Sequence, residues 1–130
     1  MEIVEETYRL TEAFPRHEQF GLASQMQRAA VSVPSNIAEG HTRGHLREYL
    51  QHISIAQGSL AELQTQLEIA VRLSYLPEEQ AGPRLDQMTA LAKQLYMLRV
   101  GQGEYVLPTS NLQNPTPNTQ NRERSVAPWT

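Results

Sequence analysis

The sequence contains no cysteine and no long apolar run. Without cysteine the protein can form neither disulfides nor thiolate metal sites. A membrane-spanning helix needs about 18 predominantly apolar residues in succession, and no stretch of the chain provides them. The opening residues, Met-Glu-Ile-Val-Glu-Glu, are acidic and periodic, unlike a secretory leader. We therefore expect a cytoplasmic protein with no membrane partner.

Positive charge is also scarce. The 130 residues carry a formal net charge of −3. Beyond Leu107 the charged residues Arg122, Glu123 and Arg124 contribute +1, so the remainder carries −4. Nonspecific binding to nucleic acid through bulk charge is not expected, and any such contact requires a local basic cluster.

Helical periodicity dominates the chain before residue 108. No segment shows the alternation or the β-branched runs of a strand, whereas four segments, at about residues 2–14, 18–39, 44–75 and 78–104, have apolar residues three and four positions apart. The third segment is the most regular, with Leu46, Tyr49, Ile53, Ala56, Leu60, Leu63, Leu67, Ala70 and Ser74 on one side. The pattern predicts an all-α fold, an antiparallel up-and-down four-helix bundle formed by residues 1–107.

The composition changes at Pro108. Residues 108–130 include four prolines and four asparagines and have few apolar side chains. Such a segment cannot bury enough surface to offset the entropy lost on ordering. We predict that residues 108–130 form a disordered C-terminal tail.

Pro34 lies within the second predicted helix. Proline lacks an amide hydrogen and its ring crowds the carbonyl four residues earlier, at Ala30, which costs about 3 kcal/mol in a straight helix. This predicts a kink or a break at residues 31–33. A polar stripe of Gln25, Arg28, Ser32, Ser35 or Asn36, and Glu39 runs alongside the proline.

The polar stripe has two interpretations. Serine and asparagine side chains can repair the backbone defect at a proline. Alternatively, the stripe faces another copy of the chain, together with a matching set of small and polar residues on the third helix that includes Gly58. On the second interpretation we predict that the kink and the subunit interface involve Ser32, Pro34, Asn36, Glu39, Gly40, Ser59 and Glu62.

The first predicted helix is much shorter than the third. At 1.5 Å per residue it spans roughly 18–20 Å, against roughly 45–50 Å for residues 44–75. Part of the groove along the third helix would then stay open. Either the natural start lies upstream or another subunit fills the gap.

A basic cluster is centred on the junction of the second and third helices. It contains Arg28, Arg43 and Arg47, with His41, His45 and His52 as further titratable groups. Repeated around an oligomer, these arginines would form a rim that binds phosphates, and we predict that they contact nucleic acid. The alternative is a solvated helix end that Glu39 and Glu48 neutralise.

Catalytic and metal sites have weaker support. Arg47 and His52 resemble the pair that metal-independent helical ribonucleases use, but five helical positions place the two side chains about 140° apart. His45, Glu48 and His52 have the spacing of metal ligands on one helical face, although an exposed helix start explains them better. No phosphate loop, dinucleotide fingerprint or nucleophile motif occurs. We predict no enzymatic activity, no metal and no cofactor.

Two blocks of sequence carry a family resemblance. "FPRHEQFGLASQMQRAAVSVPSNIAEG" and "REYLQHISIAQGSLAELQTQLEIAVRLSYL" resemble the bacterial four-helix-bundle proteins encoded in intervening sequences of 23S ribosomal RNA genes, and the related accessory proteins of diversity-generating retroelements. The resemblance covers about Thr7 to Tyr105. It implies a homo-oligomeric ring, most often a pentamer, and in the retroelement branch it implies binding to a reverse transcriptase and its RNA.

The residues and the resemblance together predict a non-enzymatic ring-forming accessory or scaffold protein. Its expected partners are RNA or an RNA/DNA hybrid, and an RNA-handling enzyme such as a reverse transcriptase. Two alternatives stay open: a scaffold that binds proteins only, and a metal-independent ribonuclease that uses Arg47 and His52.

Overall fold

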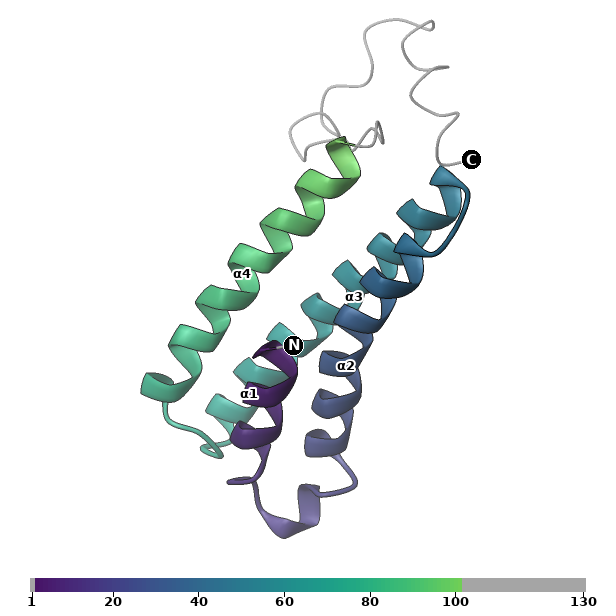
Figure 1. Ribbon diagram of the computed structural model, residues 1–130. Helices are drawn as coiled ribbons and strands as arrows, with labels where there is room; N and C mark the ends of the chain where they lie inside the picture. Colours follow the sequence, from purple (N-terminus) through teal and green to yellow (C-terminus); the bar gives the residue numbers. More distant parts are fainter. Residues whose placement is uncertain (1, 102–130) are drawn as a thin grey trace, which may run out of the picture.

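The computed structural model describes residues 2–101, which form four α-helices and one short 3₁₀ turn (Figure 1). The elements are α1 (Glu2–Thr11), η1 (Arg16–Glu18), α2 (Leu22–His41), α3 (Leu46–Arg72) and α4 (Glu78–Gly101). No strand occurs among these residues, so the predicted all-α four-helix fold is confirmed. The predicted tail, residues 108–130, and its boundary at residue 107 lie outside the described residues.

The helices pack as an antiparallel bundle. The contact between α2 and α3 is the most extensive, α4 packs along α3, and α1 lies against α2 and more loosely against α4 (Figure 1). The core follows the predicted periodicity of α3, because every predicted position from Ile53 to Ala70 is buried. The same core includes Met26 and Val33 of α2 and Met88 and Leu95 of α4.

α2 continues through Pro34 without a break. Thus the missing proline amide hydrogen does not end the helix. The Asn36 side chain donates a hydrogen bond to the carbonyl of Ser32 (2.8 Å) rather than to that of Ala30. α2 also starts later than residue 18, because Arg16–Glu18 form the 3₁₀ turn.

The connection between α1 and α2 is tied to the far end of α3. α1 ends at Thr11 instead of continuing to residue 14, and the Phe14 ring packs against Tyr75 with ring centroids 5.3 Å apart. Glu18 accepts hydrogen bonds from the Leu22 amide (2.9 Å) and from the Tyr75 hydroxyl (2.7 Å). One carboxylate therefore satisfies an amide at the start of α2 and holds the end of α3 against it.

These hydrogen bonds shift the pKa values of Glu18 and Tyr75. The hydrogen bond from the Leu22 amide, followed by that from Tyr75, lowers the pKa of Glu18 below its ordinary value of 4.5. The bond to the Glu18 carboxylate raises the pKa of Tyr75 above its ordinary value of 10.0. Folding thus favours the charged carboxylate and the protonated phenol.

Replacing Glu18 by glutamine should make stability less sensitive to acid. A carboxyl group with a lowered folded pKa contributes its stability above its ordinary pKa, here 4.5, and loses it as the pH falls through the folded value. The difference in unfolding free energy between wild type and Glu18→Gln should be largest near neutral pH and shrink below pH 4.5. Urea denaturation near neutral pH and again below pH 4.5 measures this difference in unfolding free energy. Glu68→Gln, at an exposed site on α3, is the control; a Glu18 effect that is equal at both pH values would contradict the prediction.

α4 extends past the N-terminal end of α1 (Figure 1). Along its last turns Tyr96, Met97, Leu98 and Val100 are all partly exposed, and Met97 is 61% exposed. Three positions on the predicted apolar sides of the helices are exposed. Leu46 (51% exposed) and Leu98 (37% exposed), which continues the spacing of Met88 and Leu95 on α4, lie at the end of the bundle that α1 does not reach. Ser74 follows the end of α3 at Arg72. Within residues 2–101, no helix has the length and apolar character required to cross a membrane.

Candidate nucleic-acid interface

Two of the three predicted arginines lie at the connection between α2 and α3. Arg43 is in the connection, and its guanidinium forms an ion pair with Glu39, one turn earlier. Arg47 is the second residue of α3 and is exposed. His45, which precedes α3, makes no side-chain capping hydrogen bond, so no capping side chain occupies the amides of the first turn. Two cations therefore lie beside an uncapped helix start.

A shallow hollow of about 250 Å³ lies at the same connection. Its lining residues are Gly40, His41, Arg43, Gly44, His45, Leu46 and Tyr49. The rings of His41 and Tyr49 are in contact, with centroids 5.6 Å apart and planes inclined at 53°. His41 is exposed, whereas Tyr49 is half-buried and packs against the core. The hollow thus combines an aromatic wall with an arginine.

The structure places Arg28 elsewhere. Arg28 lies on α2, thirteen residues before the helix ends at His41, which corresponds to roughly 20 Å along the axis. Its guanidinium donates a hydrogen bond to the Ser24 hydroxyl (2.8 Å). Arg28 is exposed, but it is not part of the basic group at the connection.

A polar network joins α2 to α3 just below the hollow. The Ser32 and Ser59 hydroxyls are 2.7 Å apart. The Asn36 amide nitrogen donates to the Ser32 hydroxyl (3.0 Å) as well as to the Ser32 carbonyl, and the Asn36 carbonyl oxygen lies 3.1 Å from Nδ1 of His52. Because that oxygen only accepts, Nδ1 of His52 carries the proton. In the neutral ring Nε2 is then unprotonated.

The network uses Ser32 and Asn36 of the predicted polar stripe within one chain. Ser32 bonds to both Asn36 and Ser59, while Glu62 accepts a hydrogen bond from Gln66 (3.2 Å). Glu62 is exposed, and so is Glu39, the partner of Arg43. Packing between subunits through these residues stays a prediction.

Gly40 lets the two helices approach closely. It is buried, and a Cβ at this position would lie 3.2 Å from Cβ of His52 and 3.3–3.4 Å from Cδ1 and the carbonyl oxygen of Tyr49. The carbonyl and Cβ belong to a helix that is itself packed against the core, so they cannot easily move away. The small residue at position 40 is required by this contact.

Gly40→Ala should destabilise the protein, whereas Gly58→Ala should stabilise it. Alanine favours helix over glycine by up to about 1 kcal/mol, and nothing lies within 4 Å of a Cβ at Gly58. At Gly40 crowding costs about 1–3 kcal/mol and should exceed that gain. Urea denaturation of the two variants measures the sign of each change. Stabilisation by both substitutions would show that α2 and α3 do not meet at Gly40.

The geometry bears on the ribonuclease and metal alternatives. Arg47 and His52 lie five positions apart on the regular helix α3, so their side chains stay about 140° apart around its axis. Nδ1 of His52 is also bonded to Asn36. Across residues 2–101, no three histidine, aspartate or glutamate side chains are close enough together to hold a metal ion. The structure therefore does not gather His45, Glu48 and His52 into a metal site.

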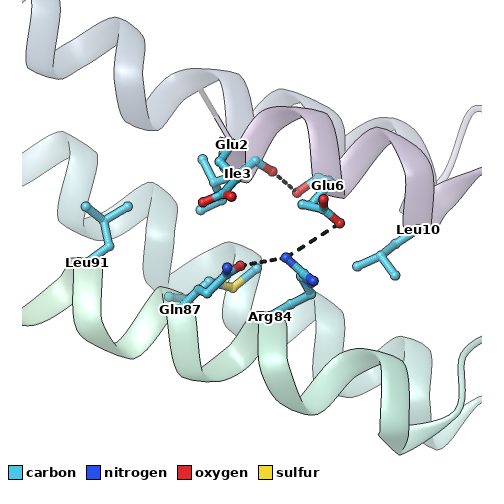
Figure 2. Close-up of a pocket in the computed structure, with 9 residues that line it drawn as sticks. Glu2, Ile3, Glu6, Leu10, Arg84, Gln87 and Leu91 are labelled. Carbon is cyan, nitrogen blue, oxygen red and sulfur yellow. Dashed lines mark hydrogen bonds and ion pairs between the residues drawn. The ribbon is translucent and has the colours of Figure 1, made fainter.

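A second hollow, of about 210 Å³, lies between α1 and α4 (Figure 2). Apolar side chains such as Ile3 and Leu91 line it, and Glu6 on its rim pairs with Arg9 (2.9 Å) and approaches Arg84 (3.6 Å). Glu2 adds a second carboxylate. Two carboxylates, Glu2 and Glu6, line this hollow against one guanidinium, that of Arg84, so it is unsuitable for a phosphate.

The fold and the sequence both have known relatives. A family model described as 23S rRNA-intervening sequence protein matches residues 1–97. The chain belongs to this family. The part of the predicted resemblance that concerns intervening-sequence proteins is thereby confirmed, and the relationship to the retroelement accessory proteins stays a prediction.

One solved structure shares the fold of this chain. It is a crystal structure of a protein of unknown function from the S23 ribosomal protein family of Bacteroides thetaiotaomicron. The TM-score is 0.68 at 21% identity, and the alignment covers 75% of this chain and 91% of the other. At this identity the similarity establishes the fold alone. A search of curated proteins finds no match.

Sequence reasoning missed three arrangements in this family member. They are the ring contact of His41 with Tyr49, the hydrogen bond of Asn36 with His52, and the Glu18 cap at the start of α2. The first pair is eight positions apart across a helix end, and the second joins two helices. No single-helix spacing connects these two pairs, so periodicity alone could not find them. Glu18 is only four positions before Leu22, but it was predicted to be part of the helix rather than its cap.

Proposed function

We propose that the protein is a non-enzymatic, homo-oligomeric scaffold that binds RNA at the α2–α3 connection. The observation that carries the proposal is the position of Arg43 and Arg47 beside the uncapped start of α3. Free amides at a helix start and guanidinium groups both donate hydrogen bonds to phosphate. The family name, which refers to intervening sequences of 23S rRNA, agrees with an RNA ligand.

Binding by one subunit should be weak. Arg43 is already paired with Glu39, and Glu48 adds a carboxylate in the first turn of α3. A phosphate must compete with both groups, in a protein whose net charge is −3. Useful affinity then requires several copies of the site, because linked sites bind one RNA with much greater avidity.

Self-association is supported by residues 96–100 of α4, which α1 does not reach and which we call the uncovered end of α4. Tyr96, Met97, Leu98 and Val100 are exposed there in a single chain. Of these, Met97 and Leu98 line one apolar hollow, and exposed apolar side chains that lie together mark protein-protein contacts. A closed ring of subunits, pentameric in the family that the sequence resembles, would cover these side chains and repeat Arg43 and Arg47 around one rim. An RNA/DNA hybrid and a reverse transcriptase are further partners that such a rim would suit.

The experiment is a titration of RNA with wild type and with Arg43→Gln/Arg47→Gln over a range of salt concentrations. Each lost guanidinium-phosphate contact should weaken binding by about tenfold. It should also reduce the slope of log affinity against log salt by about 0.7 for single-stranded RNA. Arg72→Gln removes the same charge from the opposite end of α3 and should change neither quantity.

Two results would refute RNA binding at this site. One is a wild-type affinity that does not depend on salt, and the other is an unchanged affinity in the double variant. If that double variant also retains every protein partner, the scaffold binds proteins only, an alternative that the net acidic charge favours. RNA cleavage that His52→Ala abolishes would instead establish the ribonuclease.

A further inference from the structure

The hollow beside Arg43 is smaller than a typical ligand pocket and is open on one side. Its volume of about 250 Å³ lies below the range of about 300–1,000 Å³ that is typical of pockets for drug-sized molecules. It is shallow, and an added Cβ at Gly44 would meet nothing within 4 Å, so that side is open. A planar group could enter from this side.

One wall of the hollow is a supported aromatic surface. The His41 ring leans on the Tyr49 ring at 5.6 Å, and Tyr49 is held half-buried against the core. Gly40 keeps this part of α2 in close contact with Tyr49. His41 therefore presents a ring whose position is limited by its neighbour, which reduces the entropy lost when a second ring stacks on it.

We propose that this hollow receives one unpaired nucleobase, which stacks on His41 while Arg43 and Arg47 contact the adjoining phosphates. The ligand is then single-stranded RNA, or an unpaired stretch within a folded RNA. This inference rests on the proposed function, because it specifies which form of RNA the same surface binds.

The preference for single strands follows from the chemistry of stacking. In a duplex both faces of each base are covered by neighbouring bases, so no face is free for His41. An unpaired base has free faces and stacks on aromatic side chains with little regard to sequence. The guanidinium groups contact phosphates in either form, so they contribute affinity without distinguishing strands.

The test compares one labelled RNA as a single strand and as a duplex with its complement, at equal salt. Wild type should bind the single strand about tenfold or more tightly than the duplex. His41→Ala should weaken single-strand binding by about 5- to 100-fold and leave duplex binding unchanged, and His41→Phe should retain the preference because it keeps a ring. A fluorescent adenine analogue in the strand should be quenched by wild type and not by His41→Ala.

His17→Ala is the matched control. His17 is an exposed histidine that also contacts a tyrosine ring, Tyr75, at 6.4 Å, at the opposite end of the bundle. Its removal should leave both affinities unchanged. Both histidines are on the surface, so neither substitution should prevent folding.

The outcomes separate this inference from the proposed function. Equal affinity for single strand and duplex, with both lost in Arg43→Gln/Arg47→Gln, would overturn the base-binding hollow and leave RNA binding in place. An equal loss of both affinities in His41→Ala would also overturn it, since His41 would then act through its charge. Failure of wild type to bind either RNA would overturn both proposals.

Discussion

Leu63→Ala is expected to lower the free energy of unfolding by about 2–5 kcal/mol. Leu63 lies in the middle of α3 and its side chain is fully buried, with 0% exposure. The substitution loses the transfer free energy of the side-chain carbons and leaves a cavity that close-packed neighbours fill only in part. Domains of this size are stable by about 5–15 kcal/mol, so a single methyl in place of the isobutyl group would remove a large share.

Urea denaturation at one fixed protein concentration measures this effect, because any assembly makes stability depend on concentration. Leu73→Ala is the control: the same side chain is shortened at the end of α3, where Leu73 is 51% exposed. Its effect should stay within about 0.5 kcal/mol. Equal losses at the two positions would mean that the bundle core does not run through Leu63.

The prediction at Leu63 shows what periodicity can establish. Apolar residues alternating three and four positions apart placed Leu63 on the buried side of α3 from the sequence alone, and the structure buries it. The rule weakens at the helix ends. Leu46 and Leu98 fit the period, yet they are exposed because α1 stops short of their end of the bundle. Whether an apolar side chain is covered depends on the length of its neighbours, and spacing within one helix does not contain that information.

The same limit applies to the candidate site. Composition identified Arg43 and Arg47 beside a helix start, since both lie close together in the sequence. The wall of the hollow depends instead on the angle at which α3 leaves the connection, which brings Tyr49 under His41. Likewise, Ser32 and Asn36 were recognised as a polar stripe next to Pro34, but the partners Ser59 and His52 follow from the register of α2 on α3.

Assembly concerns a different surface, the uncovered end of α4, and there the expected effect of one substitution is also large. Tyr96, Met97 and Leu98 follow one another at 100° intervals around the helix, so they cannot all face α3. Met97 is the most exposed of the three. Met97→Glu would place a carboxylate in any contact that forms here, at a cost of several kcal/mol when it is buried without a partner. That cost corresponds to a more than hundredfold weakening of the contact.

Sedimentation velocity at micromolar concentration should therefore show an oligomer for wild type and single chains for Met97→Glu. Thr89→Glu introduces the same charge at an exposed position on α4, away from the uncovered end, and should leave the oligomer intact. RNA affinity should fall together with assembly, by about 100-fold or more, because avidity is lost although Arg43 and Arg47 are unchanged. A wild-type protein that sediments as a single chain would refute assembly. If that single chain still binds RNA tightly, the connection between α2 and α3 must supply the affinity without repetition.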